Sequence, residues 1–347
     1  MRQSRPSRTL ISLGANLGNA KQTIENAKEA MVDQFGRQQL RFSRLYKTAA
    51  VGGPVGQEDF YNAVAAIESD KSAFEIWQFL HKTEQTLGRH RLKRWEARRI
   101  DLDVLLHESQ SDSHATFKSE RIWTPTFKVP HPRMSMRTFV LTPACDIAAD
   151  WIEPVTGQSL EMLSTRLDRL SLTSQMPRLL LTCESEATLD SLVKSLGRAD
   201  PSFGISKESQ PIVFRNDHTW IVTCLLPTIQ AASADGYSFQ STRATIIDRL
   251  LGLQSSRSTH FFDHWMHICR SPDPSISHWE DYCRPWAEVL GMIDQDSDTM
   301  SVVTHDFDPV KNTPPYLLAA DDLDWAAHEL IAATDAMTCP IQPCGAL

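Results

Sequence analysis

Residues 94–106, RWEARRIDLDVLL, place three arginines directly before two aspartates and an apolar run. Asp101 and Asp103 alternate with apolar residues, a pattern that predicts a β-strand. Residues two apart on a strand point to the same face, with their Cα atoms roughly 6.6 Å apart. Carboxylates held this way repel each other unless a cation lies between them, and they are the ligands that Mg²⁺ prefers while it also binds substrate phosphates. The pattern predicts a site for two Mg²⁺ ions that clamp a triphosphate.

A basic segment, residues 89–99 (RHRLKRWEARR), precedes this strand and holds six Lys or Arg residues and one Glu. Arginine offers a planar fork of donors that matches phosphate oxygens. Trp95, in the middle of the segment, suggests a part that closes over a bound ligand. A charged run by itself is typical of a solvated surface, but its position beside the paired aspartates favours a phosphate site.

The elements that must position these residues follow from the apolar spacing. Strands are expected over 8–14, 40–50, 60–69 and the Asp101 segment, with helices over 19–34 and 72–88. Residues 123–151 add an edge strand and a short helix. The β-α-β-β-α-β order predicts an α+β, ferredoxin-like domain, with an antiparallel sheet and helices packed on one face.

A change of character near residues 171–177 predicts two domains, 1–170 and 176–347, each able to fold alone. In the second, strands alternate with helices, which indicates a smaller α/β domain of unknown function. Strands are expected over 178–183, 211–214, 219–226, 301–306 and 316–320, and helices over 186–197, 241–251, 278–290 and 322–337.

Three segments of the second domain could suggest further chemistry, and none is specific. Residues 260–267, HFFDHWMH, hold three histidines, but the interleaved aromatic residues favour a packed helix over a metal site. The loop after residue 183 has no glycine or lysine, so a Walker-type phosphate loop is not expected there. CPIQPC, at 339–344, is interpreted as a proline-rich tail.

Composition restricts the class of protein. The chain has 347 residues and a formal net charge of −8, which argues against a dedicated nucleic-acid binder. We expect no signal peptide and no membrane span, because no apolar run is long enough. Seven cysteines without a CxxC pair argue against structural zinc and favour reduced thiols, so we expect a cytoplasmic protein.

Four segments, in this order, resemble one known family: SLGANLGN (12–19), YKTAAVGGPVGQEDFYNAV (46–64), GRHRLKRWEARRIDLDVLL (88–106) and VPHPRMSMRTFVLTP (129–143). The family is 6-hydroxymethyl-7,8-dihydropterin pyrophosphokinase, of folate biosynthesis, and the resemblance covers about residues 8–160. It implies transfer of the β,γ-pyrophosphoryl group from ATP, the co-substrate, to the hydroxymethyl oxygen of the pterin, with release of AMP.

The resemblance also implies a role for individual residues. Asp101 and Asp103 would hold two Mg²⁺ ions, and Trp95 would belong to the closing loop. The residues implied to face ATP are Arg89, Arg91, Arg98, His131 and Arg137, of which the first three, with Trp95, are the catalytic candidates. Those implied to contact the pterin are Thr48, Phe60, Asn62, Glu84 and Phe139. Without the resemblance, the two phenylalanines would be ordinary core residues.

Several positions depart from the family pattern, among them Ala49, Ala50, Glu96 and Pro132. Two alternatives therefore stay open. One is a different two-metal, nucleotide-dependent transferase, which needs a further acidic ligand and no pterin sandwich. The other is a catalytically weakened pterin- or nucleotide-binding protein. No protein partner is indicated.

Overall fold

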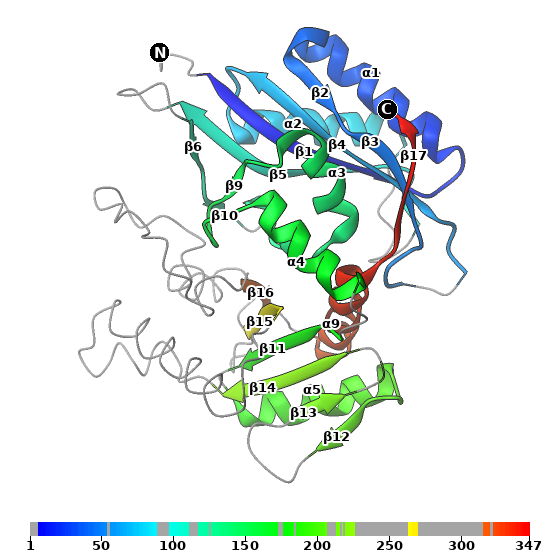
Figure 1. Cartoon of the computed structure of the whole chain (residues 1–347), viewed down its shortest axis with the longest axis vertical. Coiled ribbons are helices and arrows are strands. Elements are labelled where there is room, and N and C mark those ends of the chain that lie inside the picture. The colour runs from blue at the N-terminus through cyan, green and yellow to red at the C-terminus, as the bar shows by residue number, and fades with distance from the viewer. Residues whose placement is uncertain are drawn as a thin grey trace, which may run out of the picture.

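The computed structural model describes residues 6–53, 56–88, 97–110, 117–124, 126–172, 176–183, 185–206, 213–215, 217, 219–225, 263–269, 315–319 and 322–347. Figure 1 shows two main sheets, with helices around and between them. The strand expected at 301–306 and the helices expected at 241–251 and 278–290 lie outside the described residues. None of the described helices is both long and apolar enough to cross a membrane.

The first sheet is antiparallel throughout, as predicted. Its strands are β1 (Ser7–Ala15), β2 (Leu40–Phe42), β3 (Arg44–Thr48), β4 (Phe60–Ser69), β5 (Asp101–Gln110), β6 (Phe117–Ser119) and β17 (Ile341–Ala346). They lie in the order β17-β3-β4-β1-β5-β6, and β2 also pairs with β4. The expected strand over 40–50 is thus two strands, divided at Ser43.

Helices cover both faces of this sheet, so the prediction of helices on one face was wrong. The helices α1 (Ala20–Phe35) and α2 (Ala73–Thr86) lie on one face, and α3 (Thr138–Ala148) and α4 (Leu160–Leu172) belong to the other. The reason is visible in β4, where Ala63 and Ala65 face the first helix pair while Val64 and Ala66 face the second. A strand buried on both faces has a continuous apolar run in place of alternation.

The second sheet lies at the other end of the molecule in Figure 1. Its strands are β11 (Arg178–Cys183), β12 (Gly204–Ser206), β13 (Val213–Arg215), β14 (Trp220–Leu225), β15 (His264–Cys269) and β16 (Pro315–Ala319), in the order β12-β13-β14-β11-β15-β16. Strand β11 is parallel to both its neighbours, β14 and β15. The helices α5 (Glu186–Ala199) and α9 (Leu323–Thr338) pack on its apolar face.

Short elements complete the described chain. They are η1 (Arg37–Gln39), β7 (Ile122–Trp123), β8 (Lys128–Val129), η2 (Met134–Met136), β9 (Ile152–Glu153) and β10 (Gln158–Ser159).

The histidine-rich segment forms strand β15, so the helix expected for residues 260–267 was wrong where the structure describes them. All six residues of β15 are buried, because parallel neighbours flank it on both sides. His264 Nε2 lies 3.2 Å from Ser135 Oγ, and His267 Nδ1 lies 2.8 Å from Thr182 Oγ1. These two histidines therefore contact hydroxyl groups of the fold.

The two parts of the chain share a core. One cluster of buried apolar residues runs from α3 and α4 to β11, α5 and α9. The hydroxyl of Thr138, at the start of α3, donates to the carbonyl oxygens of Ala336 and Cys339, at 3.2 and 2.9 Å. The chain then continues as β17, which pairs with the edge strand β3 over Ile341–Ala346, where Figure 1 shows it. The last helix of the second part thus packs against the first part, and the last strand belongs to the first sheet.

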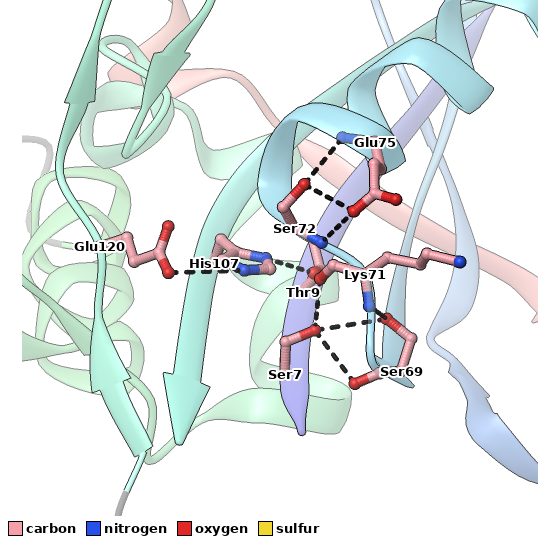
Figure 2. A network of polar contacts seen from close by, with 8 residues as sticks. All are labelled: Ser7, Thr9, Ser69, Lys71, Ser72, Glu75, His107 and Glu120. Carbon is pink, nitrogen blue, oxygen red and sulfur yellow. Dashed lines mark hydrogen bonds and ion pairs between the residues drawn. The ribbon is translucent and has the colours of Figure 1, made fainter. Parts of the chain in front are cut away.

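Strand β5, which carries the paired aspartates, is held along its length. Near its start, the buried carboxylate of Glu84 in α2 accepts a hydrogen bond from the Leu102 amide, at 2.7 Å. Towards its other end, His107 Nδ1 lies 2.7 Å from Thr9 Oγ1 of β1 (Figure 2). Burial lowers the pKa of His107, which favours the neutral ring at this contact. These contacts fix the position of β5 relative to β1 and α2.

The start of α2 is fixed by a reciprocal cap, also drawn in Figure 2. Ser72 Oγ accepts from the Glu75 amide, and the Glu75 carboxylate accepts from the Ser72 amide, at 2.9 Å. The connection between β4 and α2 is held by Ser7, whose hydroxyl donates to the carbonyl oxygen of Lys71, at 2.7 Å.

We expect Glu84→Ala to lower the free energy of unfolding by about 1–3 kcal/mol, because it leaves the buried Leu102 amide without its acceptor. Glu84→Gln is the matched control, since its amide oxygen can still accept this bond. Denaturant titration of both variants measures the difference. Equal losses in the two variants would show that the charge of Glu84, and not its acceptor, supports β5.

We also expect truncation to destabilise the first sheet. A chain ending at residue 340 loses β17, and one ending at residue 172 also loses α9 and exposes apolar surface of α3 and α4. The expected result is a stepwise fall in melting temperature, with self-association of the shorter fragment, seen by sedimentation. A monomeric 1–172 fragment that melts as high as the full chain would instead support two independent domains.

Candidate active site

A cavity of about 1030 Å³ lies where β1 and β3 end and β4 and β5 begin. Residues from distant parts of the sequence meet in it. Those used below are Thr48, Val51, Phe60, Asn62, Trp77, Arg98, Asp101, Asp103, Trp123, Phe127, Lys128, His131, Pro132, Arg133, Arg137, Phe139, Tyr316, Leu317, Leu318, Trp325 and Glu329.

The paired aspartates share this cavity, as their spacing predicted. Asp101 lies opposite Gly14 of β1, and Asp103 lies opposite Ser12. Small residues at these two positions keep the space beside the carboxylates open. The side chain of Asp101 is 17% exposed and that of Asp103 is 34% exposed, so both oxygen pairs are accessible from the cavity.

Arg98 forms an ion pair with Asp101 and is held by the turn between β1 and α1. The amide of Arg98 donates to Asn16 Oδ1, at 2.7 Å, and the Asn16 amide donates back to the Arg98 carbonyl oxygen, at 3.0 Å. Asn16 is buried, and its side chain also donates to the Glu58 carbonyl oxygen, at 3.1 Å. Asn16 was not among the site residues predicted from the sequence, although a polar residue between two glycines in a strand-to-helix turn was a usable signal.

Three predicted site residues, Arg89, Arg91 and Trp95, lie outside the described residues, as does Glu96. The interpretation of residues 89–99 as a closing loop therefore stays a prediction.

His131 lies beside Asp103, with Nε2 3.6 Å from the carboxylate oxygen Oδ2. Burial, with the nearby charges of Arg137 and Arg133, lowers the pKa of His131 well below its usual range. Its Nδ1 accepts a hydrogen bond from the Arg133 amide, at 3.2 Å. A neutral ring that accepts at Nδ1 carries its proton on Nε2. His131 therefore presents an N–H donor to the cavity.

Two arginines follow His131 on the same wall. Burial and the charge of Arg133 lower the pKa of Arg137 to about 10, so Arg137 remains a cation at neutral pH. The guanidinium of Arg137 lies 5.6 Å from the ring centre of Phe139. Burial alone would lower the pKa of Arg133, but the Glu329 carboxylate, 2.9 Å from its Nη1, raises it. The sequence could not identify Arg133, because its partner lies 196 residues away.

The residues predicted to contact the pterin lie on four elements. Thr48 of β3 and Phe60 of β4 are paired across the sheet, and Asn62 Nδ2 donates to Thr48 Oγ1, at 3.0 Å. Phe139, from α3, also lines the cavity. Glu84 differs, because it does not line the cavity and its carboxylate instead accepts from the Leu102 amide.

Aromatic side chains line another part of the same cavity. The rings of Trp77 and Phe127 lie 5.6 Å apart between centroids, and Lys128 Nζ lies 4.9 Å from the ring centre of Trp123. Flat apolar faces of this kind suit a planar heterocycle. Trp77 was not among the site residues predicted from the sequence.

The donor set around Asp101 and Asp103 fits Mg²⁺. Among the described residues, no group of three or more His, Cys, Asp or Glu side chains gathers around one point. Magnesium is bound in proteins through one or two carboxylates, with water and substrate phosphates completing its coordination. Two accessible carboxylates with arginines near them provide this arrangement, and they do not provide a closed zinc site.

Comparison with known proteins agrees with the position of the cavity. The family model described as 7,8-dihydro-6-hydroxymethylpterin-pyrophosphokinase (HPPK) matches residues 10–149, which include every predicted site residue. The chain is 30% identical over 159 residues to 2-amino-4-hydroxy-6-hydroxymethyldihydropteridine pyrophosphokinase from Synechocystis, covering 46% of this chain and 75% of that protein. The protein of the same name from Haemophilus influenzae is 33% identical over 144 residues, covering 42% of this chain and 83% of that one.

Similarity to solved structures is much weaker. Wild-type Plasmodium falciparum HPPK-DHPS aligns over 84% of this chain and 77% of its own, with a TM-score of 0.36 and 9% identity. An HPPK-DHPS in complex with substrates aligns over 57% of this chain, with a TM-score of 0.34 and 9% identity, and the chain spans about half of it, 54%. Values this low support no conclusion about the second part of the chain.

The family model matches the part of the chain that builds β1 to α3, which supplies the paired aspartates, Arg98, Arg137 and the two phenylalanines of the cavity. Three quarters of the Synechocystis protein is covered at 30% identity. The chain therefore belongs to the 7,8-dihydro-6-hydroxymethylpterin pyrophosphokinase (HPPK) family.

Proposed function

We propose that this chain transfers the pyrophosphoryl group of ATP to the hydroxymethyl oxygen of 6-hydroxymethyl-7,8-dihydropterin and releases AMP, a step of folate biosynthesis. The observation that carries the proposal is the cavity itself. It joins two accessible carboxylates and two arginines to a pair of phenylalanines and a buried amide, Asn62. This combination suits a substrate that is charged at one end and a flat heterocycle at the other.

At the charged end, we assign Asp101 and Asp103 to two Mg²⁺ ions, which would offset the charge of the triphosphate and of the transition state. Arg98 and Arg137 lie where they can donate to phosphate oxygens, and the Nε2–H of His131 adds a neutral donor. Arg89, Arg91 and Trp95 complete this proposed set from the segment that precedes Arg98.

At the heterocycle end, we assign the pterin ring to the space between Phe60 and Phe139. Offset or edge contacts with aromatic side chains stabilise a flat ring, and the amide of Asn62 can match donors and acceptors on its edge. Thr48 holds that amide in place through the 3.0 Å hydrogen bond. The position of Glu84 supports a different role from the predicted pterin contact: it holds β5 and thereby the aspartates.

The reaction requires little covalent chemistry from the protein. The hydroxymethyl oxygen attacks the β-phosphorus, the bond from that phosphorus to the oxygen bridging the α-phosphorus breaks, and AMP departs with that oxygen. The hydroxyl proton is lost to solvent. Most of the acceleration then comes from in-line positioning and from charge stabilisation by preorganised donors.

We further propose that residues 1–170 form a ferredoxin-like pyrophosphokinase domain and that residues 176–347 form an α/β domain of unknown function. The order β3-β4-β1-β5 with two crossover helices supports the first assignment, and the parallel strands β11, β14, β15 and β16 support the second.

Pro132 favours one alternative, a family member with weakened catalysis. It lines the cavity directly after His131, where the family pattern commonly has a tyrosine, so one polar contact to the nucleotide is absent. Turnover separates the two possibilities, because a binding protein would retain both ligands without releasing AMP.

The direct test is AMP release from ATP, followed by chromatography, with and without the pterin. We expect AMP to form in equal amount to pyrophosphorylated pterin, and only when pterin and Mg²⁺ are both present. ATP and pterin binding without AMP release would favour the binding protein. AMP release that is independent of the pterin would favour a different two-metal transferase.

We expect Asp103→Asn to reduce turnover by about 100-fold or more, because each bound metal supplies several kcal/mol of charge stabilisation in the transition state. The melting temperature should change little, because the side chain is about one third exposed and its neighbour His131 is neutral. Asp33→Asn, at an exposed position of α1, is the matched control. An Asp103→Asn variant with wild-type turnover at saturating Mg²⁺ would contradict the metal assignment.

A further inference from the structure

We propose that the second part of the chain completes the active-site cavity, and that Glu329 of α9 is a positioning residue that holds Arg133, and through it His131, for binding of the ATP triphosphate. The inference deepens the proposed function and rests on it. Glu329 lies outside the range matched by the family model, which ends at residue 149, whereas Arg133 and His131 lie within it.

The first observation is the wall of the cavity. Three consecutive residues of β16, Tyr316, Leu317 and Leu318, line the cavity that also contains the paired aspartates. Trp325 and Glu329, one turn apart on α9, continue this wall. Figure 1 shows why they can reach it, since α9 lies between the two sheets before the chain returns to the first as β17. A pyrophosphokinase domain cut at residue 170 would lack this side of its cavity.

The second observation is a buried ion pair across the junction. Glu329 is 2% exposed, and its Oε1 accepts from Arg133 Nη1, at 2.9 Å, and from the Tyr316 hydroxyl, at 3.2 Å. Glu329 and Arg137 also line one small cavity of about 40 Å³, together with Arg133 and Phe139. One carboxylate therefore lies next to both arginines and reduces the repulsion between them.

The third observation connects this ion pair to the metal side of the site. The amide of Arg133 donates to His131 Nδ1, at 3.2 Å, and His131 Nε2 points to Asp103, at 3.6 Å. The backbone amide of Arg133 thus fixes the orientation and the tautomer of the histidine, and Glu329 holds the side chain of the same arginine. The contacts run without interruption from Tyr316 through Glu329, Arg133 and His131 to Asp103.

Packing alone does not explain a glutamate at this position. The neighbouring residues of α9 that face the shared core are alanines and leucine, such as Ala326 and Leu330. A buried ion pair contributes little net stability, because removing both charges from water costs about as much as their attraction gains. An apolar residue would cover the core equally well, whereas only a carboxylate can hold an arginine at the cavity wall.

The test measures binding and does not depend on turnover. The probe is α,β-methylene-ATP with Mg²⁺, whose affinity for the full chain is determined by calorimetry for wild type and Glu329→Gln. We expect the dissociation constant to rise about tenfold, because the charged acceptor of Arg133 is lost. Asp324→Asn is the matched control: it lies on the same helix and is paired with Arg198, but it is exposed and does not line the cavity. It should bind as wild type does.

A double-mutant cycle separates positioning from general damage. In an Arg133→Met background, Glu329→Gln should cause no further loss of affinity, since the residue it positions is gone. An equal tenfold loss in both backgrounds would indicate a merely structural role and overturn the proposal, as would unchanged or tighter binding by Glu329→Gln.

If Glu329→Gln does not fold, Tyr316→Phe provides the same test, because it removes one donor to Glu329 and leaves the charge pair buried. A rise of about twofold or more in the dissociation constant is expected, and wild-type binding would overturn the proposal. The proposed function fails separately, if wild-type protein binds the nucleotide and releases no AMP in the presence of the pterin.

Discussion

Asp101 and Asp103 point from one face of β5 into a cavity, and their mutual repulsion is the constraint to which the surrounding chain responds. The strand cannot shift to relieve this repulsion, because the Glu84 carboxylate holds the Leu102 amide and the pairing with β1 fixes the register of β5. Compensation comes from cations outside the strand: Arg98 pairs with Asp101, and Arg133 and Arg137 line the same cavity. This arrangement suits a substrate that brings both phosphates and divalent ions.

The two arginines Arg133 and Arg137 repel each other and need a negative charge nearby. Arg133 and Arg137 stand four residues apart on one wall, and burial of Arg137 lowers its pKa to about 10. The acid that offsets them, Glu329, comes from the last helix of the chain. The same helix joins the apolar core of both parts, and the strand after it pairs with β3. Electrostatics at the site and burial of apolar surface therefore favour the same docking of the second part on the first.

The edges of the first sheet show how this docking affects the substrate region. Strand β3 ends at Thr48, which holds Asn62 and precedes the loop that lines the cavity. In an isolated first domain β3 would be an edge strand with unpaired amides. Here Ile341 pairs with Thr48 and Gln342 with Lys47, so the end of β3 is held on both sides. The position of Thr48, and thus of the Asn62 amide, depends on residues almost 300 positions away in sequence.

Local pattern was enough to predict the elements whose residues repeat with a clear period. The helices α1, α2, α5 and α9 and the strands β1, β4, β5 and β11 lie close to where apolar spacing indicated them. The antiparallel sheet followed from their order. Local pattern failed for β15, since a strand buried on all sides has no alternation, and for β17, since prolines and cysteines in residues 339–344 do not resemble a strand. It also failed for the second layer of helices, which depends on both faces of β4 being apolar.

At the site, too, local sequence determined some features and tertiary structure determined others. The sequence by itself determined that two carboxylates share a strand face, because the two-residue period of a strand is a local property, and that a basic segment adjoins them. It also determined the family, through motifs that keep their spacing between residues 12 and 143. Only the tertiary structure decided that Glu84 supports β5 and does not line the cavity, that Asn16 holds Arg98, and that Glu329 pairs with Arg133. The physical reason is that these contacts join residues far apart in the chain, and their partners are set by how buried surfaces pack.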